Sequence, residues 1–377
     1  MIPCWMPTMK LAVTAVLSAC TLLAAPLRVA IIGLEHGHVS GFLNGGSALV
    51  PAGGALHRPD IEVVGIVEPN RALFDDYARR LHLASNLYFA NIGDMAAKLH
   101  PDAALVFTST FGHTAAVEQC ARLGIHAMME KPMAVSYKDA LAIAQAAKAN
   151  HVHVLVDYET SWYSSNKASY DLLASKEIGD VRKVVVRDGH RGPKLINVRP
   201  EFFSWLTDPK LNGAGALYDF GCYGADLMTW LMHGEAPQSV TAVTQQLQPD
   251  VYPNVDDEAD VMLTYKSAIA ILQGSWNWPL NIKNMDVYGR TGYVKTIERD
   301  RIETRREHEA DARVTQAAPM AAPYDDPLHY LAAVIHGEIQ EDGSLSALET
   351  NVIVSEILDA ARQSARTGRT VRLPLSH

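Results

Sequence analysis

The stretch LRVAIIG at residues 27–33 sets the fold class of the chain. It is a continuous apolar run, which is typical of a β-strand buried on both faces. Similar runs and helix-forming segments alternate along the first half of the chain. The expected strands lie at 61–67, 103–107, 126–129 and 152–156, and the expected helices at 73–83, 95–99, 115–123 and 137–150. This alternation predicts an α/β domain over residues 26–156 with a parallel, doubly wound sheet.

The pattern changes after about residue 157. Apolar and polar positions now alternate at residues 181–186, 239–244, 259–264, 268–275 and 285–289, as in strands with one solvated face. Residues 157–377 are therefore expected to form a second domain around a mostly antiparallel sheet. Helices are expected at 216–232 and 347–367, the last one packing back on the first domain, and an irregular surface loop at 303–327.

Length and composition narrow the class of protein. The chain has 377 residues, 48% of them hydrophobic and 20% charged, which suits a globular protein with two domains. The net charge of −9 does not suit a protein that binds the negatively charged backbone of nucleic acid, so a small-molecule partner is expected. Of the four cysteines, Cys120 and Cys222 lie in the body of the chain and lack the spacing of a zinc site.

Residues 1–25 are interpreted as a signal segment. The run LAVTAVLSACTLLAA at 11–25 is apolar, uncharged and preceded by Lys10, and it is too short to span a membrane. We therefore expect export, with a periplasmic location. The tetrapeptide ending at Cys20 also matches a lipoprotein signal, so membrane attachment is expected only if Cys20 is lipidated. The alternative interpretation is a buried N-terminal helix.

Polar residues follow the first two expected strands. The turn Gly33-Leu34-Glu35-His36-Gly37-His38 occupies the place of a dinucleotide fingerprint, but only its first position is the expected glycine. Glu68 ends the second strand, where a carboxylate accepts hydrogen bonds from a ribose diol and repels a 2′-phosphate. Glu68 thus favours NAD, while Arg71 keeps NADP open.

Three further segments resemble one protein family. They are Glu130-Lys131-Pro132, residues 108–113 (TSTFGH) and residues 213–226 (GAGALYDFGCYGAD). In order and spacing they are similar to the Gfo/Idh/MocA oxidoreductases. The resemblance implies an N-terminal Rossmann domain, a C-terminal α/β domain with an open, mostly antiparallel sheet, a nicotinamide cofactor, and a sugar or cyclitol substrate.

The resemblance also implies roles for individual residues. Lys131 matches the family's lysine that contacts the reacting hydroxyl, and Pro132 matches the residue that holds this lysine in place. Asp219 and Tyr223 match a further segment of the family pattern. Most members have histidine at the position of Tyr223. The cofactor-binding set is then Gly33, His36, Gly37, His38, Glu68, Arg71, Thr108, Ser109, His113, Glu130 and Lys131. The irregular turn at residues 33–38 and the tyrosine at position 223 depart from the family pattern.

Oxidation of a secondary alcohol needs a hydride acceptor and a base. Tyr and Lys are weak bases near neutral pH, but a neighbouring ammonium stabilises a tyrosinate. We therefore expect Lys131 to polarise the substrate, and Tyr223 or Lys131 to relay the proton, with Asp219 orienting the pair. The alternative for Tyr223 is a core aromatic on the helix at 216–232.

Sugar sites combine aromatic faces with polar donors. The expected substrate contacts are Tyr158, Trp162, His190, Arg191 and Asp226. The histidines at 36, 38, 113 and 190 with Glu35 invite a metal interpretation, but they form no closed ligand set, so no metal is expected.

Export would separate the protein from the pool of free nucleotide. We therefore expect a tightly bound NAD(H) that returns to its starting redox state in every turnover. The first hypothesis is a carbohydrate oxidoreductase. The second is a glycoside-cleaving or epimerising enzyme that oxidises transiently at C3, with His190 as the additional base. The third is a non-catalytic sugar-binding protein. A homo-oligomer, dimer or tetramer, is expected through the second sheet.

Overall fold

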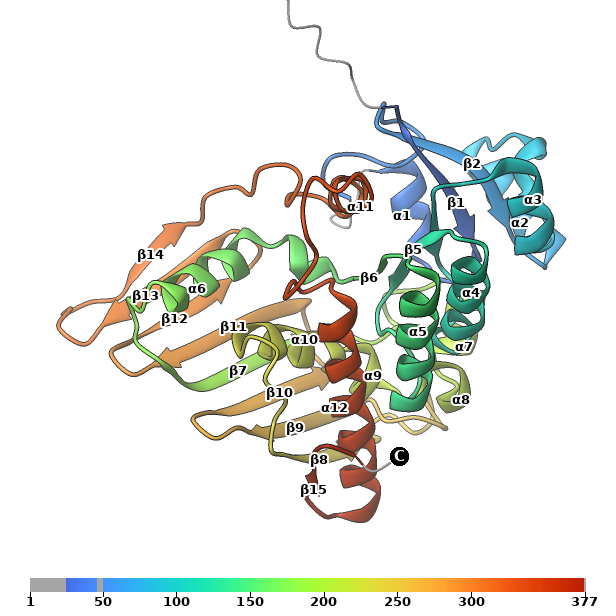
Figure 1. Ribbon diagram of the computed structural model, residues 1–377. Helices are drawn as coiled ribbons and strands as arrows, with labels where there is room; N and C mark the ends of the chain where they lie inside the picture. Colours follow the sequence, from blue (N-terminus) through green and yellow to red (C-terminus); the bar gives the residue numbers. More distant parts are fainter. Residues whose placement is uncertain (1–24, 46–49, 376–377) are drawn as a thin grey trace, which may run out of the picture.

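The computed structural model describes residues 25–45 and 50–375 and divides into two α/β domains (Figure 1). Nearly all of the expected signal segment lies outside the described residues, so the signal and lipidation predictions stay predictions. Among the described helices, none combines the length and the apolar character that a membrane crossing requires.

The first domain is built on the expected parallel sheet. Six parallel strands lie in the order β3-β2-β1-β4-β5-β6. The chain adds strands on one side of β1 up to β3 and on the other side from β4 onward, so the strand order switches between β1 and β4. The strands are β1 (Leu27–Ile32), β2 (Ile61–Val67), β3 (Tyr88–Phe89), β4 (Ala103–Val106), β5 (His126–Glu130) and β6 (Val154–Asp157). The helices are α1 (Val39–Asn44), α2 (Arg71–Leu81), α3 (Ile92–Leu99), α4 (Thr110–Arg122) and α5 (Tyr137–Asn150).

The second domain contains a nine-stranded sheet in the order β14-β13-β12-β11-β7-β10-β9-β8-β15. Only β7 and β10 are paired in parallel; the other pairs are antiparallel. The strands are β7 (Val181–Gly189), β8 (Ser239–Gln245), β9 (Glu258–Thr264), β10 (Ile269–Ser275), β11 (Ile282–Gly289), β12 (Gly292–Ile297), β13 (Arg301–Arg306), β14 (Arg313–Gln316) and β15 (Val371–Arg372). The predicted mostly antiparallel sheet is therefore confirmed.

Helices cover one face of this sheet and the junction between the domains. They are α6 (Ser164–Ala174), α7 (Pro200–Leu206), α8 (Pro209–Asn212), α9 (Ala216–Asp219), α10 (Gly221–Leu231), α11 (Pro327–Ile335) and α12 (Leu348–Thr367). Figure 1 shows α12 running between α5 and the second sheet. The backbone N–H of Tyr137 donates to Asp359 of α12, and Arg362 donates to the carbonyls of Val135 and Gly213. α12 therefore ties the two domains together.

Two local predictions are wrong. The expected helix at 216–232 is interrupted at Phe220, which leaves the carbonyl oxygen of Asp219 free to accept a hydrogen bond from Lys131 Nζ at 3.0 Å. The expected irregular loop at 303–327 contains the end of β13 and all of β14. β13 lies between β12 and the edge strand β14 and carries mostly charged side chains, with only Ile302 and Thr304 buried, so the strand shows only a weak apolar period.

Candidate functional site

A cavity of about 700 Å³ lies at the junction of the two domains. The N-terminal domain contributes the turn after β1 and the end of β5, and the second domain contributes the segment after β7, α9, α10 and the start of β11. Its lining includes Gly37, His38, Lys131, Glu159, His190, Arg191, Arg199, Phe202, Asp219, Phe220, Tyr223 and Lys283. Most of these side chains are polar or charged, which suits a hydroxylated ligand.

Lys131 and Asp219 form an ion pair across the two domains. Lys131 directly follows β5, and its Nζ lies 2.6 Å from Asp219 Oδ1; both side chains are buried. The other carboxylate oxygen accepts a hydrogen bond of 2.8 Å from the indole N–H of Trp276. The Lys131–Pro132 peptide bond is cis. The ammonium group is thus fixed at the cavity wall.

A second lysine lies beside Tyr223. Lys283 at the start of β11 has its Nζ 2.6 Å from Glu159 Oε2 and donates to the Tyr223 hydroxyl at 3.2 Å. The Tyr223 ring faces both ammonium groups, 4.3 Å from Lys283 Nζ and 5.2 Å from Lys131 Nζ. The residue pattern singled out neither Lys283 nor Glu159, because no motif marks them and only the antiparallel register brings β11 to this position.

The charge states of these groups correct the expected proton relay. Burial is the largest single effect on the pKa of Lys131 and lowers it, but the charge and hydrogen bond of Asp219 and the smaller effects of other neighbours together outweigh burial, so the net pKa is raised and the ammonium persists. Burial raises the pKa of Tyr223 well above that of a free phenol. Burial opposes ionisation of Asp219, but Lys131 and His190 lower its pKa to about 2. Neither Lys131 nor Tyr223 is therefore poised to accept a proton.

The turn after β1 is held by carboxylates of its own domain. Glu68 Oε2 accepts a hydrogen bond from the backbone N–H of Leu34 at 2.9 Å, and its Oε1 accepts one from Asn70 at 2.8 Å. Glu68 is 2% exposed, and burial raises its pKa. Glu68 therefore braces the turn, and its expected contact with a ribose stays a prediction. Arg71 is paired with Asp75 and lies over the Tyr88 ring.

Helix α7 of the second domain lies across this turn. The Trp205 indole N–H donates to the carbonyl oxygen of Glu35 at 3.3 Å, and the Phe202 ring packs against His36. A Cβ added at Gly37 would lie 2.9 Å from Phe202, so glycine is required for this contact. Just before α7, Arg199 pairs with Asp76 of α2 at 2.8 Å. Helix α7 therefore lies against this edge of the sheet.

His36, His38 and Glu130 lie together next to the cavity. His38 Nδ1 lies 2.9 Å from Glu130 Oε1, within hydrogen-bond distance, and His36 Nε2 lies 3.9 Å from Glu130 Oε2, beyond it. Their ligand atoms lie close enough together to hold a metal ion. His36 Nδ1 accepts the backbone N–H of His38, so neutral His36 carries its proton on the nitrogen that faces Glu130.

The other expected cofactor residues gather at the same edge. Thr108 contacts Gly33, and the backbone N–H of Ser109 donates to Glu35 Oε2 at 3.1 Å. His113 is buried, and its Nδ1 lies 3.2 Å from the carbonyl oxygen of Pro132. Its Nε2 is a buried acceptor without a hydrogen-bond partner among the described residues. Burial lowers the pKa of His113 to about 4, so it is neutral.

The structure separates the expected substrate contacts into two groups. His190 and Arg191 line the cavity. The other three do not and are corrected. Tyr158 is fully buried, and its hydroxyl donates a hydrogen bond to Asn351. The Trp162 indole N–H donates to Asp157, and the ring lines a separate aromatic pocket with Tyr170 and Trp230. Asp226 is enclosed in the core. Their types suit a sugar site, but their places on strand and helix turn them inward.

Asp188 is a buried carboxyl group behind the cavity. It lies on β7 beside Lys283 of β11, is 1% exposed, and neither oxygen has a hydrogen-bond partner among the described residues. Burial raises its pKa to about 8; the charges of Lys283 and Lys131 act against this shift and that of Glu159 adds to it. Asp188 is therefore protonated at neutral pH.

This raised pKa predicts a pH dependence of stability. A group with a raised native pKa stabilises the fold below its unfolded pKa, and that contribution is lost as pH rises through the native value. Asp188→Asn should therefore gain stability relative to wild type as pH rises from about 4 to about 8, at about 1.4 kcal/mol per unit of pKa shift. Urea unfolding at several pH values measures this difference. A difference independent of pH would contradict the assignment.

The carboxyl edge of the first sheet fits a nicotinamide dinucleotide. The switch point between β1 and β4 is where such sheets bind dinucleotides. Gly33 has φ 83°, and a Cβ there would lie 2.8 Å from Thr108, so the turn requires glycine. The unsatisfied Nε2 of His113 supplies a buried acceptor at the same edge. Gly33, Thr108, Ser109, His113 and Glu130 would hold the cofactor, and Lys131 and His38 would lie at the cavity end.

Comparison with known proteins agrees with this fit. Residues 27–158 match the model of an oxidoreductase family with an NAD-binding Rossmann fold, and residues 167–295 match the GFO/IDH/MocA C-terminal domain. The trans-1,2-dihydrobenzene-1,2-diol dehydrogenase of Sus scrofa is 23% identical over 246 residues, 64% of this chain and 68% of that protein. The match to the Macaca fascicularis enzyme of that name spans 60% of its length.

Two solved structures share the fold over nearly the whole chain. An aldose-aldose oxidoreductase from Caulobacter crescentus, complexed with glycerol, has a TM-score of 0.76 at 21% identity and covers 92% of this chain and 100% of that one. An inositol dehydrogenase homologue from Azotobacter vinelandii, complexed with NAD+, has a TM-score of 0.78 at 17% identity and covers 93% and 98%. With both domain models matched, the chain belongs to the Gfo/Idh/MocA family of NAD-binding oxidoreductases.

Proposed function

We propose that the protein is a nicotinamide-dependent oxidoreductase that acts on a secondary hydroxyl of a sugar, glycoside or cyclitol. The observation that carries this proposal is the buried Lys131–Asp219 pair, which sets a permanent ammonium group where the dinucleotide edge meets the polar cavity. The names of the relatives, a dihydrodiol dehydrogenase, an inositol dehydrogenase homologue and an aldose oxidoreductase, support substrates with adjacent hydroxyl groups.

The residues of the cavity suit stabilisation of a developing oxyanion. When bound, the dinucleotide supplies the hydride acceptor. Lys131 donates a hydrogen bond to the substrate oxygen, where a fixed cation in a water-poor site has its largest effect. His190 Nδ1 accepts the backbone N–H of Gly192 at 2.9 Å, so its Nε2 carries the proton and is a second donor. Arg191 and Lys283 add donors for neighbouring hydroxyls.

We further propose that the cofactor stays bound between turnovers, as NAD(H) in an exported, periplasmic protein. Helix α7 supports this, because Trp205 and Arg199 fasten it to the turn and to α2 over the dinucleotide edge. The apolar segment at residues 11–25 supports export. A protein outside the cytoplasm that retains its nucleotide would need a second substrate to return the reduced nucleotide to its oxidised form.

The first prediction from this proposed function concerns nucleotide content and Lys131. Protein expressed with its own leader and then denatured should release nearly one NAD(H) per chain, measured by chromatography. Lys131→Met should retain the nucleotide but lose about 10²–10⁴-fold in reduction of bound NAD+ by a panel of sugars and cyclitols. Lys148→Met, at an exposed position of α5, is the matched control and should behave as wild type.

Other outcomes have distinct meanings. Release of NADP(H) would overturn the preference for NAD. Empty protein that also ignores added nucleotide, together with sugar binding unaffected by Lys131→Met, would replace the enzyme proposal by a sugar-binding protein. Release of an aglycone from a glycoside without net change in nucleotide would move the glycoside-cleaving hypothesis ahead of net oxidation.

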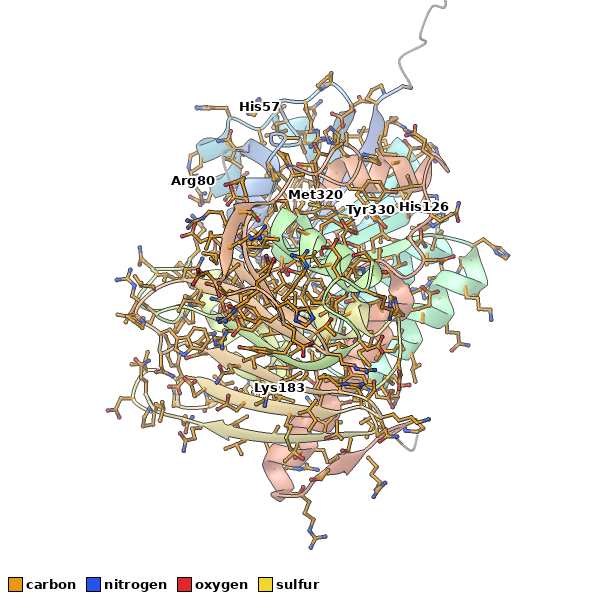
Figure 2. The ribbon with its side chains drawn as sticks, turned by 90° about the vertical axis from the view of Figure 1, so that its left-hand side faces the viewer. His57, Arg80, His126, Lys183, Met320 and Tyr330 are labelled. Atoms are coloured by element: carbon orange, nitrogen blue, oxygen red, sulfur yellow. The ribbon has the colours of Figure 1, made fainter. Side chains whose placement is uncertain are left out.

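We also propose that the protein forms a homo-oligomer through the open face of the second sheet. α6, α10 and α12 cover one face, and the other exposes apolar side chains on neighbouring strands. These are Val243 of β8, Met262 of β9, Ile269 of β10 and Tyr288 of β11. Figure 2 shows Lys183 of β7 on the same sheet, and the register places it opposite Tyr288. In the register Val243 lies opposite Asp260, and Ile269 lies opposite Thr264 and Lys183, so apolar and polar residues alternate on this face. Exposed apolar residues on an uncovered face are typical of an interface.

This surface gives a second prediction. Met262→Asp should convert a dimer or tetramer into monomers, because a charge in the centre of an apolar contact is left without a partner. Light scattering after gel filtration measures the mass. Val314→Asp, on the exposed edge strand β14, is the control and should keep the wild-type mass. A monomeric wild type, or an unchanged mass for Met262→Asp, would remove this face as the interface.

A further inference from the structure

The cavity raises the question of which group takes the proton of the substrate hydroxyl. The charged lining residues are already committed. Lys131 and Lys283 are ammonium groups in ion pairs, Arg191 and Arg199 stay protonated, and the Tyr223 phenol is buried. Asp219 and Glu159 are ionised but weakly basic, since Lys131 and Lys283 outweigh the effect of burial and lower the pKa of each to about 2.

The two histidines of the cavity differ in which nitrogen carries the proton. In His190, Nδ1 accepts a backbone N–H, so Nε2–H is a donor and the ring offers no lone pair to the substrate. In His38 the arrangement is the reverse. Its Nδ1 lies 2.9 Å from a carboxylate oxygen of Glu130, which accepts hydrogen bonds when ionised, so Nδ1 must be the donor.

Glu130 is built to hold this orientation. It ends β5, is 2% exposed, and lies between His38 and His36, which both direct protonated nitrogens at it. Burial opposes its ionisation, but the two histidines reverse this effect and lower its pKa. The remaining nitrogen of His38, Nε2, has no hydrogen-bond partner within residues 25–45 and 50–375, and the side chain is 27% exposed at the cavity wall.

We propose that His38 is the proton acceptor of the reaction and that Glu130 is its positioning residue. This inference rests on the proposed oxidoreductase function. The O–H bond of the substrate alcohol breaks, its proton goes to His38 Nε2, the carbinol hydrogen leaves as hydride to NAD+, and the carbon–oxygen double bond forms. Reduction runs the same steps in reverse, with His38 as the donor. A base oriented by a buried carboxylate is a recurrent arrangement in catalysis.

The assignment predicts a loss of turnover and not of substrate binding. The groups that face His38 are Glu130 of β5, His36 of the turn and Glu159 after β6, and α7 contributes the ring of Phe202. His38→Gln should lower kcat about 10²–10⁴-fold, with little change in KM.

The experiment uses the full chain with NAD+, and D-glucose, D-xylose and myo-inositol as probes. His38→Ala should lose the same activity and recover part of it when imidazole is added, whereas a merely structural role would give no rescue. Glu130→Gln should lower kcat, because its amide can donate to Nδ1 and so leave the proton on Nε2. His57→Gln is the control, and Figure 2 shows His57 at the periphery of the first domain. Retained nucleotide in all variants, measured after denaturation, excludes loss of cofactor as the cause.

A second readout does not depend on turnover. Nitrogen-15 NMR of the histidine rings at neutral pH should show His38 as the Nδ1–H tautomer in wild type and altered in Glu130→Gln. If no probe is oxidised by wild type, the proposed function fails, and this measurement still tests the dyad. An Nε2–H tautomer, a full rate in His38→Gln, or a stoichiometric metal ion on His38 in the purified protein would each overturn the proposal.

Discussion

The ion pair between Lys131 and Asp219 is the contact on which the site depends. It joins the end of β5 in one domain to the end of α9 in the other, and both side chains are shielded from water. A buried charge without a partner costs several kcal/mol, so each residue constrains the other. The interruption at Phe220 frees the Asp219 carbonyl for the same ammonium, and the Trp276 indole fixes the second carboxylate oxygen. The pair therefore sets the charge of the cavity and, together with α7 and α12, holds the two domains in place.

Around this pair the charges alternate in sign. Lys283 is held by Glu159, the histidines at 36 and 38 are held by Glu130, and Asp188 avoids a negative charge by keeping its proton. The result is a cavity lined by cations whose counterions, Asp219 and Glu159, are fixed beside them. Such a preorganised site stabilises an oxyanion without rearrangement. The proposed proton acceptor, His38, lies at the same cavity because the lysines are held as ion pairs and the phenol of Tyr223 is buried.

Much of the fold could be predicted from residue patterns, because burial on both faces leaves a strong mark. The apolar run at 27–33 and its successors predicted the parallel sheet, and Lys131, Asp219, Tyr223, His190 and Arg191 all reach the cavity. Three kinds of feature could not be predicted. β13 and β14 carry charged residues at a sheet edge, Lys283 depends on a register between distant strands, and the role of Glu68 depends on backbone N–H groups that it contacts only in the folded chain. Tyr158, Trp162 and Asp226 show the limit of residue type as a guide, since each suits a sugar but faces the core.

The central claim is that a hydride moves between a substrate carbon beside Lys131 and a dinucleotide held at the edge of the first sheet. The most direct measurement is deuterium transfer, in which the purified protein is incubated with carbon-deuterated glucose or myo-inositol and the released nucleotide is analysed by mass spectrometry. The released nucleotide should be reduced and should carry a single deuterium from the substrate carbon. Nucleotide that stays free of deuterium, in a protein that binds the same sugar in the cavity, would contradict the claim.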